Sequence, residues 1–394
     1  MIKKLLIFTL LLFSFTGFLF AQDADSSFDD EFDDFDSIFE QAAEDIEVEQ
    51  TAPVVSAPAS GPVSAIRFSG HFEGGVGLAC VIIDKPDFGG YLDLDNILYI
   101  NVKPNPIFAL HGAVETSFEN KFALALNYFY FDYMLLDRVF ISAGKKSLTW
   151  GYTRLFENCN VMEDTNGQLN GEFRFPWSTG TLTFVGCYNY ALFNTTPSYR
   201  NISYAVSLEQ TIGHTSINLF AKKYGQSEMY GTVHKGPLVG LEAKRTILGF
   251  DVYSQGFTRL LDYKKLNSTQ GYRDVTATAG FYRLWDAQDP NFGINIEYQY
   301  IWVPGANPGT GGIIHNHEIF LQGGIKRMGK NKNMKIGVEW QHNFSVNKGE
   351  FTFAFITDGL LPYASWENGF EIDYTASSKP KFILGSKISI KLDY

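Results

Sequence analysis

Apolar and polar residues alternate position by position through most of the chain between Ser64 and its last residue. The stretch 293–302 shows the pattern clearly: one parity holds Ile294, Ile296, Tyr298, Tyr300 and Trp302, and the other holds Asn295, Glu297 and Gln299. Alternation with a period of two predicts β-strands that have one apolar and one polar face. Because a helical periodicity is nearly absent from this part of the chain, we expect an all-β fold.

Segments of this kind follow one another about 16 to 18 times between residues 64 and 394. From Lys145 onward, the connections between them alternate in length. Long connections are expected at 145–168, 190–200, 223–236, 255–274 and 304–316, and short ones at 177–180, 211–215, 246–249, 285–291 and 327–333. The alternation weakens after Met334, where residues 357–369 fall out of phase.

Two architectures suit many amphipathic strands: a soluble sandwich or propeller, and a membrane barrel whose apolar face points outward. A propeller would repeat every 40–50 residues or so, and no such self-similarity is visible. A sandwich of this length would expose many strand edges. Short turns at one end and long loops at the other are typical of outer-membrane barrels. We therefore predict a transmembrane antiparallel up-and-down β-barrel over residues 64–394.

The composition agrees with this prediction. Aromatic residues make up 16% of the chain, with 35 Phe and 21 Tyr beside 37 Gly, which suits strands and tight turns. Cys80, Cys159 and Cys187 are odd in number and lack the spacing of a metal or redox motif. We expect neither a disulfide framework nor a bound metal or cofactor.

The first residues have the pattern of an export signal. Lys3 and Lys4 precede an apolar run from Leu5 to Phe20, and the small residue Ala21 follows. The run is shorter than the roughly 20 residues that a membrane-spanning helix needs. We predict a signal peptide over residues 1–21, the alternative being an uncleaved anchor.

An acidic segment follows the leader. Residues 23–50 hold 13 acidic side chains and no Lys or Arg, so that residues 51–394 retain 30 acidic and 30 basic side chains. With no basic excess to neutralise phosphates, the body is not expected to bind nucleic acid. Residues 51–63, with Pro53, Pro58 and Pro62, form a linker to the barrel.

The acidic segment, residues 22–50, also has an aromatic stripe. Its members are Phe28, Phe32, Phe35 and Phe39, continued by Ala42 and Ile46. This spacing places the stripe on one side of a helix. Two interpretations remain open: a disordered, solvated periplasmic tail, and a helix that docks on a partner or plugs the barrel.

The chain ends on the alternating stretch "GSKISIKLDY". The outward parity would carry Ile388, Ile390, Leu392 and Tyr394. This ending resembles the carboxy-terminal assembly signal of bacterial outer-membrane proteins, an alternating strand that stops on an aromatic residue. The resemblance implies recognition by the barrel-assembly machinery, contact with outer-membrane lipid and a strand that closes the barrel.

In architecture the chain resembles the general bacterial porins. In that family the third external loop, here 145–168, folds into the lumen, and its acids face a basic wall. The resemblance implies a pore constriction with loop acids Glu157, Glu163 and Asp164 and wall cations Arg67, Lys103 and Arg138. The Pro-Glu-Phe-Gly-Gly stretch of the family is missing, so an external loop without a pore role remains an alternative. Porins often form homotrimers, but no residue of this sequence specifies one.

A barrel of about 16 to 18 strands leaves an aqueous channel. The expected function is passive diffusion of small hydrophilic solutes, with selectivity set by pore width and lining charge. The alternatives are a substrate-specific transporter plugged by the acidic segment, and a surface adhesin. His315 and His317 lack a third metal ligand, and no Gly-x-Ser-x-Gly elbow or other catalytic set is present, so we do not expect an enzyme.

Overall fold

The computed structural model describes residues 66–118, 121–162, 169–188, 202–225, 236–261, 263–266, 268–285, 290–306, 312–361, 363–376 and 378–394. The expected signal peptide, acidic segment and linker lie outside these residues. No helix in the described part of the chain is long and apolar enough to cross a membrane.

The described residues form 18 strands, in agreement with the predicted number. They are β1 (Ile66–Ile82), β2 (Pro86–Asn105), β3 (Phe108–Phe118), β4 (Phe122–Leu135), β5 (Val139–Lys145), β6 (Leu169–Trp177), β7 (Gly180–Tyr188), β8 (Ile202–Ile212), β9 (Thr215–Lys223), β10 (Leu238–Ile247), β11 (Phe250–Leu260), β12 (Tyr272–Trp285), β13 (Asn291–Trp302), β14 (His315–Met328), β15 (Met334–Asn343), β16 (Lys348–Leu361), β17 (Ala364–Thr375) and β18 (Lys381–Asp393). Short 3₁₀ turns are η3 (Glu157–Cys159), η6 (Tyr263–Lys265) and η7 (Thr269–Gly271).

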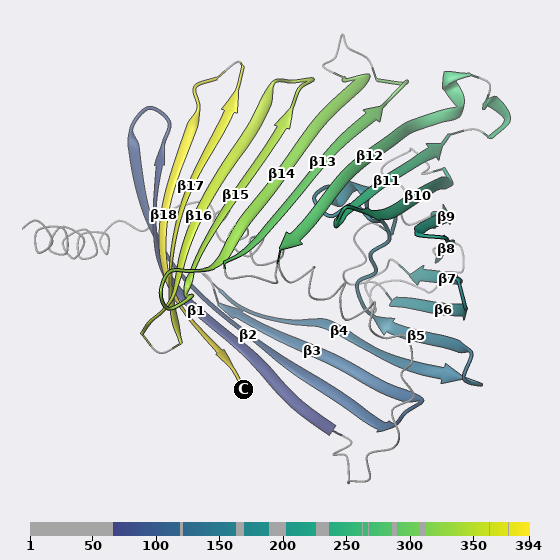
Figure 1. Ribbon diagram of the computed structural model, residues 1–394, viewed down its shortest axis with the longest axis horizontal. Helices are drawn as coiled ribbons and strands as arrows, with labels where there is room; N and C mark the ends of the chain where they lie inside the picture. The colour runs from purple at the N-terminus through teal and green to yellow at the C-terminus, as the bar shows by residue number, and fades with distance from the viewer. Residues whose placement is uncertain are drawn as a thin grey trace, which may run out of the picture.

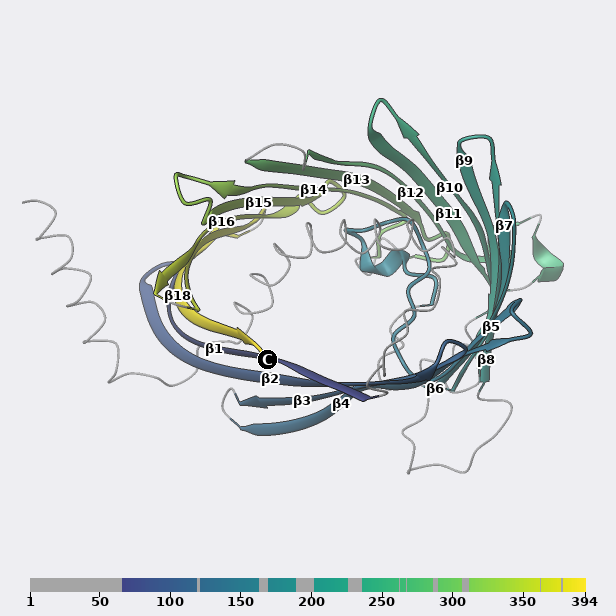
Figure 2. The ribbon, with the colours of Figure 1, turned by 60° about the horizontal axis from the view of Figure 1, so that its bottom comes forward.

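Each strand pairs antiparallel with its neighbours in the sequence, and β1 pairs with β18, so the sheet closes into the predicted up-and-down barrel (Figures 1 and 2). At the seam, Val76 lies opposite Ile388 and Phe72 opposite Leu392. The pairing runs to the last residue, because the Gly70 amide donates to the Tyr394 carbonyl at 2.7 Å and the Tyr394 amide donates to the Gly70 carbonyl at 3.0 Å. Closure leaves no open sheet edge.

The connections divide between the two ends of the barrel. Those expected to be long follow β5, β7, β9, β11 and β13, at the end opposite to Ile66 and Tyr394. The connection expected at 255–274 is shorter than predicted, because β11 continues to Leu260 and β12 begins at Tyr272. Residues 357–369 are mostly strand: a register shift between Asp358 and Leu361 changes the phase of the alternation, which the sequence pattern could not show.

The two faces of the barrel have the predicted inverted polarity. On the outer face, the side chains of Phe68, Leu124 and Ile388 are exposed by 67%, 69% and 58%. On the inner face, Glu297 and Gln299 are fully buried. A water-soluble fold places these residue types the other way round, whereas a membrane barrel requires this arrangement.

The terminal tyrosine adds a side-chain contact across the seam. Its ring covers Gly70 of β1, so closely that a Cβ at this position would overlap the ring. Its hydroxyl donates to the Oδ1 atom of Asn96 on β2 at 2.8 Å. Tyr394 therefore links three strands on the outer face, and the glycine provides the space for its ring.

We expect that Gly70→Ala destabilises the barrel, because the new methyl group displaces the Tyr394 ring and breaks its hydrogen bond to Asn96. Overpacking and one lost hydrogen bond predict a loss of about 1–3 kcal/mol. The measurement is urea unfolding of the barrel in lipid bilayers. The control is Gly186→Ala, also on a strand but with its nearest neighbouring atom 3.8 Å from the added Cβ. Equal unfolding free energies for the two variants would contradict the role of Gly70.

Candidate functional site

The enclosed space of the barrel is the candidate site, and the segment that follows β5 lies inside it. Figure 2 shows this segment, with η3, within the ring of strands. Its described part, residues 146–162, bonds to side chains that point inward from β8 to β13. Of the two alternatives left open by the sequence, the structure shows the inward-folded loop. We call residues 146–162 the inner loop.

Glu297 of β13 is the main acceptor for the inner loop. Its carboxylate accepts hydrogen bonds from the backbone amides of Arg154 at 2.5 Å, Leu155 at 3.2 Å and Phe156 at 3.3 Å. The Tyr253 hydroxyl on β11 donates to it as well, at 2.5 Å. A fully buried carboxylate is costly unless its oxygens are satisfied, and these four donors offset that cost.

Glu242 of β10 holds the preceding turn of the inner loop. It accepts from the backbone amide of Tyr152 at 3.1 Å and from the side chain of Asn218 at 2.7 Å. The Tyr152 hydroxyl in turn donates to Glu209 of β8 at 3.1 Å. Burial and the neighbouring carboxylates of Glu209 and Glu242 raise the pKa of Tyr152, so its hydroxyl remains a proton donor.

Two side chains donate to carbonyls later in the inner loop. The buried ammonium group of Lys222, on β9, donates to the Met162 carbonyl at 2.9 Å and lies 4.6 Å from the centre of the Tyr224 ring. Gln255 of β11 donates to the Cys159 carbonyl at 2.8 Å. Carboxylates thus accept from the amides of the inner loop, and an ammonium and an amide group donate to its carbonyls.

The tip of the inner loop packs tightly on the wall. The side-chain amides of Asn158 and Gln299 exchange two hydrogen bonds, of 3.0 and 2.7 Å. The Cys159 thiol is fully buried, 3.0 Å from the Thr278 hydroxyl. Burial raises the pKa of this thiol, so it stays protonated and has the character of a packing group. Phe156 adds an edge-on contact with Phe320 of β14, with 5.9 Å between ring centres.

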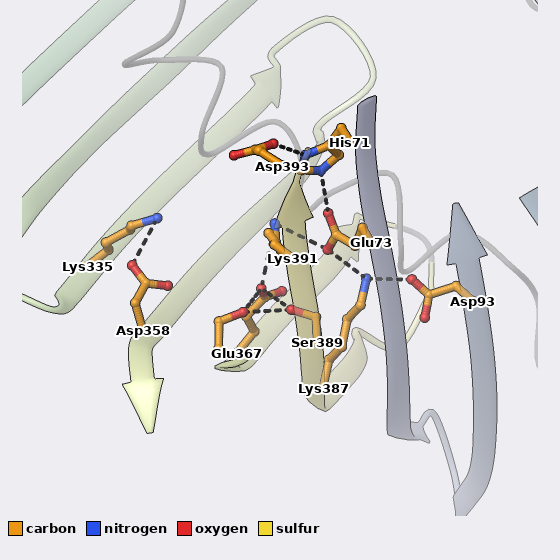
Figure 3. A network of polar contacts seen from close by, with 11 residues as sticks. His71, Glu73, Asp93, Lys335, Asp358, Glu367, Lys387, Ser389, Lys391 and Asp393 are labelled. Atoms are coloured by element: carbon orange, nitrogen blue, oxygen red, sulfur yellow. Dashed lines mark hydrogen bonds and ion pairs between the residues drawn. The ribbon is translucent and has the colours of Figure 1, made fainter. Parts of the chain in front are cut away.

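A network of charged side chains lines the inner face at the seam (Figure 3). The Lys387 ammonium lies 2.9 Å from Asp93 and 3.9 Å from Glu73, and the Lys391 ammonium lies 3.2 Å from Glu73. His71 bonds to Asp393 at 2.7 Å. The network joins β18 to β1 and β2 on the side opposite to Tyr394. Since Lys387 and Asp93 are both buried, their pairing matters more to stability than a surface ion pair does.

The three predicted wall cations all lie toward the short-turn end of the barrel. Arg67 lies opposite Asn101 near the start of β1, and Lys103 lies near the end of β2, both at the short-turn end. Arg138 is in the turn before β5, so the length of that strand, about 20 Å, separates it from the residue where the inner loop begins. The side chains of Glu157, Glu163 and Asp164 lie outside the described residues. Their roles stay predictions.

The terminal residues of the expected assembly signal face outward as predicted. Ile388, Ile390 and Tyr394 are exposed on the outer face, and Leu392 is half-buried on the same parity. These positions pair with the outward parity of β1, where Ile388 meets Val76. Their recognition by the assembly machinery stays a prediction.

The structure offers no strong metal site among the described residues. His315 and His317 point to the outer face, where they bond to Tyr300 at 2.7 Å and Tyr298 at 2.6 Å. Carboxylate oxygens of Glu350, Glu371 and Asp373 lie within 4.8 Å of one another on the inner face, but Lys381 already pairs with Asp373 at 3.4 Å. We assign no metal to either group.

Sequence reasoning placed Glu297 on the inner face but missed its part in holding the inner loop. The acid and the amides that it binds are more than 140 positions apart. The available signal was a single acid in the middle of a strand, flanked on its inward parity by the neutral amides Asn295 and Gln299. Such an acid needs a partner, but the pattern does not name the partner.

No protein-family model matches the chain, and none of the curated proteins compared with it matches either. Solved structures do match. OccK11 (OpdR) of Pseudomonas aeruginosa is 10% identical with a TM-score of 0.52, over 83% of this chain and 96% of that one. OpdQ of the same organism is 9% identical with a TM-score of 0.50, over 83% and 99%. OccD3 (OpdP), also of Pseudomonas aeruginosa, is 8% identical with a TM-score of 0.50, over 85% and 94%. The porin-like barrel fold expected from the sequence is confirmed.

We expect that Glu297→Gln loosens the inner loop, because an amide side chain has one acceptor oxygen where the carboxylate has two. Hydrogen bonds to a charged group contribute about 1.5–3 kcal/mol, so exchange of the amide hydrogens of residues 154–156 should accelerate about 10- to 100-fold. Hydrogen-exchange mass spectrometry of the folded barrel measures this.

The matched control is Glu367→Gln, which neutralises another buried inward carboxylate, one that bonds to Ser389 on the seam and not to the inner loop. Its inner-loop amides should exchange as in the unmodified protein. If Glu297→Gln and Glu367→Gln gave the same exchange at residues 154–156, Glu297 would not be the group that holds the loop.

Proposed function

We propose that this protein is a channel of the bacterial outer membrane through which small hydrophilic solutes diffuse passively. The observation that carries the proposal is the closed ring of 18 strands with an apolar outer face and a polar inner face. Barrels of 16 to 18 strands leave a water-filled lumen, whereas about eight strands fill the space with their own side chains. The barrel fold shared with the Pseudomonas aeruginosa structures supports this function.

The inner loop supports a pore of restricted width. It occupies part of the lumen beside β8 to β13 and is held there by Glu242, Glu297 and Lys222. A wall segment fixed by this many bonds narrows the passage permanently, in contrast to a lid that opens and closes. The loop acids Glu157, Glu163 and Asp164 would add charge to the narrowed passage, and Arg67, Lys103 and Arg138 would add it closer to the short-turn end.

The membrane arrangement belongs to the same proposal. The short-turn end, with Ile66 and Tyr394, would face the periplasm, and the long loops would face the exterior. The acidic segment 22–50 would then follow signal-peptide cleavage into the periplasm, and the terminal strand would be read by the assembly machinery. We propose a transport protein, with no enzymatic activity.

The test is ion conductance of the purified full-length protein in planar lipid bilayers. We expect stepwise insertions of discrete ohmic conductance, because water fills a lumen lined by polar side chains. Liposomes that contain the protein should also swell in small sugars more rapidly than in large ones.

Folded barrels that insert without conductance would contradict the proposal and favour the adhesin alternative. Removal of residues 23–50 tests the plugged-transporter alternative. A large rise in conductance would identify the acidic segment as a plug, and unchanged conductance would remove that idea.

A further inference from the structure

We propose that the lumen admits small cationic solutes in preference to anionic ones, an inference that rests on the channel function proposed above. It is carried by one half of the inner wall, formed by β14–β18 and β1–β4, which we call the acidic half-barrel. Each of these nine strands places at least one carboxylate on its inward parity. Examples are Glu73 on β1, Glu115 on β3, Glu318 on β14 and Glu367 on β17.

Four lysines of the acidic half-barrel are already neutralised by carboxylates of the same wall. Lys387 pairs with Asp93 at 2.9 Å, and Lys391 pairs with Glu73 at 3.2 Å. Lys335 lies 3.3 Å from Asp358, and Lys381 lies 3.4 Å from Asp373. A lysine that holds a carboxylate at this distance offers little net field to a passing anion. Four further cations share the inward parity of these strands: Arg67, Lys103, Lys326 and Lys348.

Carboxylates remain after these pairs are formed. Glu318 accepts its hydrogen bond from the neutral side chain of Gln341, at 2.7 Å. Glu115 shares the inward parity of Ala113 and His111 and has no Lys or Arg within ion-pair distance among the described residues. Near the long-loop end, carboxylate oxygens of Glu350, Glu371 and Asp373 lie within 4.8 Å of one another, which concentrates negative charge on this part of the wall. The acidic half-barrel therefore carries net negative charge.

The other half of the inner wall, from β5 to β13, is balanced. Lys146 pairs with Glu172 at 2.9 Å, Arg259 with Asp274 at 3.1 Å and Lys244 with Asp251 at 3.4 Å. The charges that remain there hold the inner loop, as Glu297 does with three backbone amides. The described residues of this half form no basic surface that would cancel the field of the acidic half-barrel, so the lumen attracts cations.

The expected size of the effect follows from Coulomb's law. One elementary charge about 7 Å from an ion in water changes the local ion concentration about threefold before screening. The screening length is about 10 Å at 0.1 M salt and about 3 Å at 1 M. Preference for K⁺ over Cl⁻ should therefore be strong in dilute KCl and weak in concentrated KCl.

The experiment measures the reversal potential of the full-length protein in planar bilayers under a KCl gradient, at low and at high mean salt. The expected result is a K⁺/Cl⁻ permeability ratio above one, which falls as the salt concentration rises.

The double variant Glu115→Gln/Glu318→Gln should lower the ratio about two- to threefold at low salt. Lys335→Gln should raise the K⁺/Cl⁻ permeability ratio, because Asp358 loses the positive charge that it pairs with. Thr352→Val, an uncharged change on the same wall, should leave it unchanged.

The outcomes separate this inference from the proposed function. Absence of conductance would overturn the channel itself. Conductance with a ratio of one or below, or a ratio that the double variant does not lower, would overturn the cation preference and leave the channel standing. If the double variant failed to fold, as judged by its heat-dependent mobility on gels, Glu115→Gln and Glu318→Gln are each measured alone, with the same expected direction.

Discussion

Every backbone amide and carbonyl of a strand that crosses hydrocarbon must find its partner in another strand, because lipid tails offer none. In this protein the constraint is met by closure: β18 returns to β1, and the paired ladder extends to Tyr394 itself. The rest of the structure depends on that seam. It is secured on the outer face by the Tyr394 ring over Gly70 and on the inner face by Lys387, Asp93 and Glu73.

Closure also separates two environments. Strands that alternate apolar and polar residues then present one face to lipid and the other to an enclosed aqueous space. The inner face uses its polarity in two different ways. From β8 to β13 the polar groups bind the inner loop, through its backbone amides and carbonyls and through side chains such as Tyr152 and Asn158. In the acidic half-barrel, part of the negative charge is not paired with lysines and acts on solutes in the lumen. The proposed cation preference rests on this difference between the two halves.

The sequence predicted what is local and periodic. The period-two pattern identified the strands, their inward parity and their number, because burial of each side chain depends on its own strand alone. The pattern failed where extra residues in a strand shift the register, and where two contacting residues are far apart in the sequence. The register shift between Asp358 and Leu361 broke the phase at residues 357–369. The inner loop could not be placed, since Glu297 meets residues 154–156 only after the sheet has closed. The sequence also could not place the suggested wall cations along the barrel axis. The structure puts Arg67, Lys103 and Arg138 toward the short-turn end, and their part in a constriction stays a prediction.

The most direct test compares two consecutive positions of the closing strand in lipid vesicles. Spin labels are attached at Ile388→Cys or Ser389→Cys in a background where Cys80, Cys159 and Cys187 are serine. Collisions with oxygen, which concentrates in lipid, and with a water-soluble nickel complex are then measured by electron paramagnetic resonance. The account predicts that the label at 388 meets oxygen and the label at 389 meets nickel. The reverse order, or protection of position 388 from oxygen by protein packing, would contradict a barrel with its apolar face in lipid.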